Sequence, residues 1–323
     1  MAFSGGVDST YLLAEALRVL GPESCLAVTA ISDSMAPEEF DEAQELAESL
    51  GARWITINTH EIDDPAYRAN DRNRCYHCKH ELFGTLTEMA RKEGLGAVLD
   101  GSNADDVGDW RPGTRAAREL EVLSPLMDAG LTKDEIRALS HERGLSTATK
   151  PAQACLASRL PYGTEVTAER LRQVAAAETT LRSEGFDVFR ARYHDGVARI
   201  ELGETELERI ADQQVRQRVF AGMSACGFAS VCVDLRGFKS GNMNRRKDGE
   251  SLQIEPAWSG VLNSLGLDMV RVRRVGDVTI LAAPEDQIDA LLESGKREEI
   301  VSAFESRGAM HIALDLAPVE STD

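Results

Sequence analysis

The chain has 323 residues, 42% of them hydrophobic, a length that favours about two domains with real cores. Its 54 acidic residues outnumber 36 basic ones, and the formal charge is −18. This charge argues against a broad nucleic-acid interface, because phosphate backbones are bound by clustered Lys and Arg. No apolar run reaches the roughly 18 residues of a membrane span, and the first residues do not form a signal peptide. The six cysteines are too few for a disulfide scaffold. These properties predict a cytoplasmic α/β enzyme with reduced thiols.

Strands and helices are expected to alternate through the first half of the chain. A helix over residues 11–20 ends at Gly21-Pro22. The later segments are strands over 24–31, 54–58 and 97–100 and helices over 37–50, 78–93 and 132–143. Such alternation predicts a parallel sheet, in which ligands bind at the carboxyl ends of the strands. Only residues 1–3 are left of a strand before the first helix, so we expect a longer N-terminal segment to precede this start.

The second half is predicted to be a small α+β unit that occurs twice. The first copy has helices over 167–184 and 204–225 and strands over 188–193, 197–202 and 230–235. One constant shift in residue number, without a gap, aligns 185–192 with 266–273, Arg216 with Arg297, and Asp234 with Asp315. We call this shift the repeat offset. We therefore expect domains at 1–163, 164–240 and 250–323. The last would be a degenerate repeat over 253–316, joined by a linker at 240–249.

A glycine-rich segment stands where the first strand would lead into the first helix. It lacks the Gly-Lys-Ser/Thr of a Walker loop. Its adjacent glycines let backbone N–H groups face an anion, and the helix N-terminus adds a positive dipole end. Asp8 would repel a bare phosphate, so its presence favours Mg²⁺ beside the phosphate. An ordinary strand-turn-helix junction is the alternative. The candidate phosphate-binding residues are Ser4, Gly5, Gly6, Asp8, Ser9 and Thr10.

The sequence Ser-Gly-Gly-Val-Asp-Ser at residues 4–9 resembles the pyrophosphate loop of the N-type ATP pyrophosphatases, the PP-loop superfamily. That superfamily includes NAD and GMP synthetases and tRNA thiolation enzymes. Its members cleave ATP to AMP and pyrophosphate and adenylate an acceptor oxygen. The resemblance implies the PP-loop α/β fold, ATP and Mg²⁺ as cofactors, and adenine bound by the backbone near residues 30–32. The further ATP-site candidates are Ala30, Ser32 and Gly101.

Four more segments, at residues 74–79, 100–106, 111–119 and 150–159, together resemble the LarE family of ATP-dependent sulfur transferases. The resemblance covers about residues 1–245. It implies adenylation of a carboxylate of pyridinium-3,5-dicarboxylate mononucleotide and replacement of its oxygen by sulfur, for the nickel-pincer cofactor of lactate racemase. It also implies a small-molecule nucleotide substrate and no nucleic acid or membrane as partner. We expect a homo-oligomer.

Three cysteines are candidates for the sulfur chemistry. Cys75 and Cys78 form a C-x₂-C, and Cys155 lies in a loop of the same predicted domain. Three converging thiolates suit a [4Fe–4S] cluster with one open iron. The alternatives are zinc with His77 or His80 as fourth ligand, a redox C-x₂-C pair, and unconnected thiols.

The family resemblance bears on this choice. Some LarE-like proteins carry only the cysteine that corresponds to Cys155, and they sacrifice its sulfur and leave dehydroalanine. Others have three cysteines and are thought to hold a cluster, and this sequence resembles the second kind. The remaining cysteines, Cys25, Cys226 and Cys232, lie in helix or strand patterns and are interpreted as small buried hydrophobes.

Two sets of polar residues complete the predicted site. Asn103, Asp105 and Asp106 follow a strand end and could bind Mg²⁺ or orient the ribose and the acceptor; a solvated turn is the alternative. Arg190 and Arg192 alternate along one strand and so share a face, which suits a phosphate or carboxylates.

Glu178 and Glu201 could join these arginines. The LarE resemblance makes this the substrate-phosphate and metal region, whereas ion pairs on the surface are the alternative. The repeat keeps arginines at Arg271 and Arg273 but has Ser259 and Ala282 in place of the glutamates.

Two other functional classes remain open. The first is another PP-loop enzyme, such as a tRNA thiolation enzyme or an amidotransferase-type synthetase; the charge of −18 disfavours tRNA. The second is a non-catalytic nucleotide- or metal-binding protein.

Overall fold

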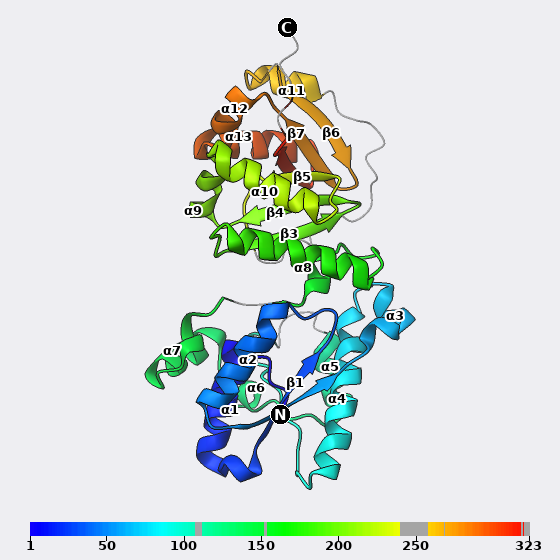
Figure 1. Ribbon diagram of the computed structural model, residues 1–323, viewed down its shortest axis with the longest axis vertical. Coiled ribbons are helices and arrows are strands. Elements are labelled where there is room, and N and C mark those ends of the chain that lie inside the picture. The colour runs from blue at the N-terminus through cyan, green and yellow to red at the C-terminus, as the bar shows by residue number, and fades with distance from the viewer. Residues whose placement is uncertain (107–111, 152–153, 240–257, 268, 318, 320–323) are drawn as a thin grey trace. The chain divides into compact units, whose positions relative to one another are not determined.

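The computed structural model (Figure 1) describes residues 1–106, 112–151, 154–239, 258–267, 269–317 and 319. The chain divides into two compact units. Unit 1 comprises residues 1–158 and 162–171, and unit 2 comprises residues 159–161 and 172–323. Among the helices of the described residues, none has the length and apolar character needed to cross a membrane.

Unit 1 is an α/β layer structure around short parallel strands, as the alternation of elements predicts. β1 and β2 pair in parallel, with Leu26 opposite Arg53 at one end and Ile31 opposite Asn58 at the other. The elements of this unit are α1 (Val7–Leu20), β1 (Leu26–Ile31), α2 (Pro37–Ser49), β2 (Arg53–Asn58), α3 (Pro65–Arg68), α4 (Arg74–Lys92), α5 (Pro112–Glu119), α6 (Pro125–Asp128) and α7 (Lys133–Glu142). The predicted α/β class with a parallel sheet is confirmed.

The first residues extend this parallel arrangement. The Phe3 N–H donates to the Val28 carbonyl and the Ala2 N–H to the Leu99 carbonyl, both at 2.9 Å, so residues 1–3 run between β1 and the segment at Leu99. The strand predicted at 97–100 is reduced to an isolated parallel bridge from Leu99 to Leu123. It is too short for a regular strand because the chain turns away after one bridged residue.

Several predicted helices have different bounds in the structure. The helix predicted over 11–20 begins at Val7, so Asp8, Ser9 and Thr10 lie in its first turn. α4 begins at Arg74 rather than at Cys78, so both cysteines of the C-x₂-C lie in its first two turns. The helix predicted over 204–225 is broken into α9 (Glu204–Leu207), a 3₁₀ turn and α10 (Gln213–Ala225). The break has a local cause: the Asp212 carboxylate accepts hydrogen bonds from the N–H groups of Gln214 and Val215 and starts a new helix.

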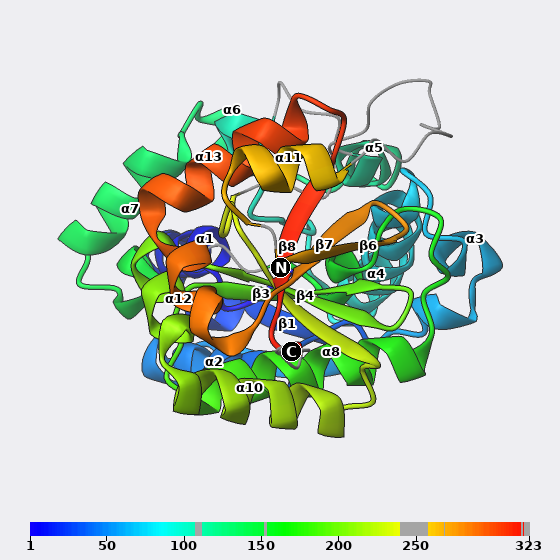
Figure 2. The same ribbon diagram turned by 90° about the horizontal axis from the view of Figure 1, so that it is seen from above.

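Unit 2 is built on one six-stranded sheet with the order β3-β4-β5-β8-β7-β6. Its strands cross the middle of Figure 2, and in that view α10 lies below them and α13 above them. The sheet therefore joins strands of the predicted second and third domains; the predicted linker at 240–249 lies outside the described residues. The remaining elements are α8 (Ala168–Ser183), β3 (Phe189–His194), β4 (Val197–Leu202), β5 (Ser230–Asp234), α11 (Trp258–Ser264), β6 (Arg271–Val275), β7 (Val278–Ala282), α12 (Glu285–Leu292), α13 (Ser294–Glu305) and β8 (His311–Asp315).

The two faces of this sheet differ in chemistry. Alternate residues such as Ala191, Ile200 and Val233 join one hydrophobic core with helix residues from both parts of unit 2. The residues between them point to the opposite face, where Arg199 and Asp234 are fully buried. A buried charge is tolerated only when it is paired, so this face must be held by ion pairs.

Candidate active site

The segment at residues 4–10, called the loop below, consists of a turn at residues 4–6 and the first turn of α1. Gly5 has φ +66°, and a Cβ there would lie 3.2 Å from the Cα of Ala43, so glycine is favoured twice over. The Ser9 hydroxyl donates to the Gly6 carbonyl at 3.1 Å and accepts from the Ser4 N–H at 3.3 Å. Thr10 is buried, and within the described residues its hydroxyl has no hydrogen-bond partner. The loop conformation is thus fixed by its own hydroxyl and glycine residues.

Gly101 lies against this loop. A Cβ at Gly101 would come 3.1 Å from the Ser9 nitrogen and 3.3 Å from its Cα. The close approach of two backbones explains why a residue without a side chain stands there. The structure thus brings Gly101, expected at the ATP site, to the phosphate loop.

Asp8 connects the loop to the acidic segment after Leu99. The Asn103 amide donates to Asp8 Oδ1 at 3.4 Å, and the Lys133 ammonium contacts the same carboxylate. Asp105 is held nearby, because its carboxylate accepts the Lys133 N–H at 2.8 Å. The Asp106 carboxylate instead accepts a hydrogen bond from the Asn103 N–H at 3.1 Å and so closes the turn that contains both residues. Carboxylate oxygens are ligands that Mg²⁺ prefers, so Asp8 suits a metal bound to phosphate oxygens.

Two lysines at this site were not assigned from the sequence. Lys133 contacts Asp8, and the Lys150 ammonium donates to the Gly5 carbonyl at 3.0 Å and pairs with Glu42 at 2.7 Å. Both cations stand beside a loop with phosphate-binding features. Lys150 opens one of the segments of the family resemblance, which was the only signal for it; Lys133 lies 125 residues from Asp8 and had none.

The carboxyl end of β1 contacts the loop that contains Cys155, which is called the cysteine loop below. The Ser32 and Ser34 hydroxyls lie 2.9 Å apart, and Ser34 donates to buried Glu61 at 2.9 Å. The Leu156 N–H donates to the Ser34 carbonyl at 2.8 Å. Residue 156 directly follows Cys155, so this bond fixes the cysteine loop at the strand end where adenine binding is expected.

Two of the three candidate cysteines, Cys75 and Cys155, face one buried cation, Arg74, and Cys78 lies near both of them. Cys75 and Cys155 are exposed and Cys78 is half-buried. The Arg74 guanidinium donates to the Asn70 side chain at 2.5 Å and to the Ala157 carbonyl at 2.8 Å, which ties the start of α4 to the cysteine loop. Burial by itself would lower the pKa of Arg74, but the pKa is raised because the Cys155 and Cys75 sulfurs face this group.

Cys78 is held as a thiol by its surroundings. Burial first, and then the nearby Glu61 and Cys155, raise the pKa of Cys78 to about 12. Three cysteines from two segments suit a [4Fe–4S] cluster, whose binding would displace this proton. Within the described ranges, no three His, Cys, Asp or Glu side chains lie close enough together to hold a single metal ion. A cube of four irons spaces its thiolates more widely than one ion does.

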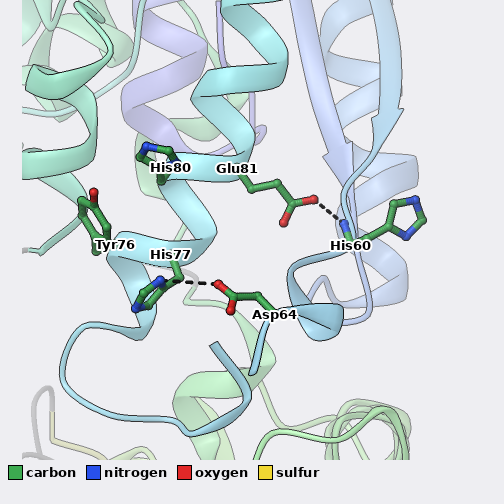
Figure 3. Close-up of a pocket in the computed structure, with 6 residues that line it drawn as sticks. All are labelled: His60, Asp64, Tyr76, His77, His80 and Glu81. Carbon is green, nitrogen blue, oxygen red and sulfur yellow. Dashed lines mark hydrogen bonds and ion pairs between the residues drawn. The ribbon is translucent and has the colours of Figure 1, made fainter. Parts of the chain in front are cut away.

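The histidines of the zinc alternative line a pocket of their own (Figure 3). His77 Nδ1 lies 3.5 Å from a carboxylate oxygen of Asp64, and the His60 N–H donates to Glu81 at 2.6 Å. His80 packs against the ring of Tyr76. These six residues line a cavity of about 400 Å³.

In unit 2 the predicted arginines and glutamates form a buried ladder of charges. Arg192 pairs with Glu201 at 2.9 Å, and Glu201 also pairs with Arg199 at 2.9 Å. Glu178 forms a two-pronged pair with Arg159 at 2.8 and 2.9 Å. Arg159 had not been assigned, although it ends the last segment of the resemblance. The alternative of surface ion pairs is wrong for this set, since Arg192, Glu201, Glu178 and Arg159 are all buried.

Arg190 is the least buried cation of the ladder, and its guanidinium donates to the Phe189 carbonyl at 2.6 Å and lies over the ring of Phe238. Burial first, and then the neighbouring Arg159, lower the pKa of Arg190 to about 10. A buried cation beside another cation is stabilised by an anion, so this end of the ladder suits a phosphate. Glu178 and Glu201 already accept from arginines, and their magnesium ligation remains a prediction.

Known proteins resemble this chain over most of its length. An uncharacterized protein of Synechocystis sp. is 42% identical over 245 residues, 76% of this chain and 91% of that protein. Pyridinium-3,5-bisthiocarboxylic acid mononucleotide synthase of Lactiplantibacillus plantarum is 42% identical over 245 residues, 76% of this chain and 88% of that enzyme. An uncharacterized protein of Methanocaldococcus jannaschii is 28% identical over 240 residues, 74% of this chain and 90% of that protein.

No family model matches the chain. Among solved structures, NMN synthetase from Francisella tularensis aligns at 16% identity with a TM-score of 0.28, over 47% of this chain and 77% of that one. That likeness is too low to bear on the fold.

The loop at the start of α1 and the parallel strands of unit 1 are what the resemblance to the PP-loop class predicts. Within that class, the identity of 42% over most of both chains identifies the family. The chain belongs to the LarE family, the pyridinium-3,5-bisthiocarboxylic acid mononucleotide synthases.

Proposed function

We propose that this protein adenylates a carboxylate of pyridinium-3,5-dicarboxylate mononucleotide and replaces one of its oxygens by sulfur, for nickel-pincer cofactor synthesis. The membership in the synthase family supports the substrate. The observation that carries the proposal is the hydrogen bond from the Leu156 N–H to the Ser34 carbonyl. It joins the end of a nucleotide-binding strand to the cysteine loop, so activation and sulfur delivery can share one acyl group.

In the first step a substrate carboxylate oxygen attacks the α-phosphorus of ATP. The bond from that phosphorus to the bridging oxygen breaks, and pyrophosphate leaves. Backbone N–H groups of the loop at Gly5 and Gly6 and the lysines beside it stabilise the charge on the departing phosphates. Asp8 would hold Mg²⁺ against these oxygens. Ala30 and Ser32 would contact the adenosine.

In the second step a sulfur nucleophile attacks the acyl carbon. The carbon–oxygen bond to phosphate breaks, AMP leaves, and a thiocarboxylate remains. Sulfur suits this step because it is strongly nucleophilic near neutral pH. We place its source at Cys75, Cys78 and Cys155, where Arg74 supplies positive charge. A [4Fe–4S] cluster bound there would supply a transferable sulfide on its open iron.

Unit 2 supplies the substrate-binding residues in this proposal. Arg190 and Arg192 bind the phosphate of the mononucleotide, since guanidinium groups bind phosphate oxygens in pairs. Arg159 holds Glu178 and Arg199 holds Glu201, so the carboxylates fix the arginine side chains in place. Asn103, Asp105 and Asp106 of unit 1 orient the acceptor or Mg²⁺.

The proposal is tested by separating the two half-reactions. Anaerobically purified protein is incubated with ATP, Mg²⁺ and pyridinium-3,5-dicarboxylate mononucleotide, and pyrophosphate and thiocarboxylate are both measured. Wild type should give both products. Cys155→Ala should give pyrophosphate without thiocarboxylate. The control is Cys226→Ala, which should match wild type, since the Cys226 thiol donates a hydrogen bond to the Gly222 carbonyl. Absence of substrate-dependent pyrophosphate in wild type would contradict the proposal.

A further inference from the structure

The sheet of unit 2 has an internal symmetry that its register makes visible. Arg190 lies opposite Glu201 between β3 and β4, and at the corresponding positions of the repeat Arg271 lies opposite Ala282 between β6 and β7. Both of these strand pairs are antiparallel, and both are followed by a parallel partner, β5 or β8. The two halves therefore share strand order, direction and register. We call residues 168–235 copy 1 and residues 258–316 copy 2.

The two copies meet through β5 and β8 around a two-fold axis. Val233 lies opposite Leu314, and these two positions correspond to each other at the repeat offset. At the same offset Cys232 corresponds to Ala313 and Asp234 to Asp315. The flanking pairs, Cys232 with Asp315 and Asp234 with Ala313, are therefore converted into each other. The backbone shows the same exchange, because the Leu235 N–H donates to the Ile312 carbonyl and the Leu316 N–H donates to the Val231 carbonyl, both at 2.9 Å.

Ion pairs between the copies are reciprocal as well. Arg216 of copy 1 pairs with Glu285 of copy 2, and Arg297 of copy 2 pairs with Glu204 of copy 1. Arg216 and Arg297 correspond at the repeat offset, as do Glu204 and Glu285. Both guanidinium groups are buried, with 2% and 5% exposure. Reciprocal contact of identical patches is the property of an isologous dimer interface.

The residues that copy 2 has kept, and those that it has lost, also indicate that its surface toward copy 1 is the part retained. The contacts across the axis are kept in both copies. The charge ladder is not, since Ile280 replaces Arg199 and Ala282 replaces Glu201. Copy 2 has thus retained the surface that meets copy 1 and lost the charges that suit a substrate.

We propose that copy 2 is a built-in partner, which occupies at the edge of β5 the place that a second chain's copy 1 would take. An uncovered strand edge pairs with another chain, and copy 1 is complementary to itself by the reciprocity above. Copy 2 closes that edge within the chain, so the full chain does not self-associate there. This inference concerns only unit 2 and does not rest on the sulfur chemistry.

The test reverses charges so that pairing within the chain is repulsive and pairing between chains is attractive. In the double variant E204R/R216E, position 204 faces Arg297 and position 216 faces Glu285, so both internal pairs repel. Two such chains can instead pair position 204 of one with position 216 of the other. The quadruple variant E204R/R216E/E285R/R297E restores attraction inside the chain. Arg216 also donates to the Ile210 and Ala211 carbonyls, but this loss is common to both variants.

Mass is measured by light scattering during size-exclusion chromatography of the full chain. The double variant should have twice the wild-type mass, and the quadruple variant should return to the wild-type mass. The control E184R/R218E reverses an ion pair inside copy 1 and should leave the mass unchanged. A double variant with wild-type mass, or a quadruple variant that behaves as the double one, would overturn the proposal.

Discussion

The two units keep their candidate site residues in opposite ways. In unit 1 they include loop backbone, small buried hydroxyls such as Thr10, and the cysteines Cys75 and Cys155, which are exposed to solvent. In unit 2 they are arginines and glutamates locked in buried pairs, such as Arg192 with Glu201. Substitutions in unit 1 should therefore lower activity and leave the fold intact, whereas those in unit 2 should first lower stability.

The largest effect is expected in unit 2. Glu201→Ala leaves Arg192 and Arg199 without a common buried partner. Removing one partner of a buried pair costs about 3–5 kcal/mol of folding free energy, measured here by urea unfolding. The control is Arg18→Ala in unit 1, whose pair with Glu15 is exposed and should contribute less than about 1 kcal/mol. Equal losses in both variants would remove the contrast between the units.

The phosphate loop should show the reverse behaviour. Asp8→Ala and Ser9→Ala should each lower pyrophosphate release by about 10²-fold or more. The first change removes the carboxylate that would hold Mg²⁺ at the phosphates, and the second removes the hydroxyl that holds the turn at Ser4 and Gly6. Gly101→Ala should lower it as well, since its Cβ would lie 3.1 Å from the Ser9 nitrogen. Circular dichroism and the urea midpoint should stay near wild type for Asp8→Ala. Activity near wild type in both loop variants would show that the loop does not bind ATP.

A smaller effect on the free energy of unfolding is expected when the pH is lowered. Burial first, and then Arg199, lower the pKa of His311 to about 2, from the ordinary value near 6.5. Between these values the unfolded chain binds a proton that the folded chain does not, so stability falls as the pH drops below about 6.5. The slope from one such group approaches about 1.4 kcal/mol per pH unit. His311→Gln should flatten the curve of unfolding free energy between pH 6 and 4; an unchanged slope would argue against the burial of a neutral imidazole.

The smallest expected effect is a difference in alkylation rate among the cysteines of unit 1 in the metal-free protein. Cys75 and Cys155 are exposed, whereas the pKa of Cys78 is raised to about 12 by burial and Glu61. Iodoacetamide at pH 8 should therefore modify Cys75 and Cys155 first, because the thiolate is the nucleophile. Cys78 should become reactive as the pH rises toward 12. Peptide mass spectrometry measures this order, and equal rates at pH 8 would contradict the difference in environment.

Much of unit 1 could be predicted from the sequence because its signals are local. The alternation of strands and helices indicated the class, and Gly5 and Gly101 were singled out as ATP-site candidates, although their close approaches to Ala43 and Ser9 became visible only in the structure. The contacts of Lys133 and Lys150 could not be predicted, since each meets the loop from more than a hundred residues away. Distant polar contacts leave no periodic pattern.

Unit 2 shows a different limit. The alternation of Arg190 and Arg192 placed them on one face, but it could not show that the face is buried. Burial depends on which strands lie side by side, and the adjacency of β5 and β8 joins residues far apart in the chain. The partners Arg159 and Arg199 are not distant in the chain: Arg159 lies 19 residues before Glu178, and Arg199 lies on β4 with Glu201. Their pairing was missed because a strand or helix pattern does not show which side chains turn toward each other.

We propose that sulfur is held by the three cysteines together and is not donated by Cys155 alone. The most direct measurement follows pyrophosphate, thiocarboxylate and the protein mass in one anaerobic turnover of Cys75→Ala, Cys78→Ala and Cys155→Ala. All three variants should release pyrophosphate and lack bound iron, none should form thiocarboxylate, and the wild-type chain should keep its mass after turnover. A Cys75→Ala protein that completes one turnover and leaves dehydroalanine at position 155 would contradict the account.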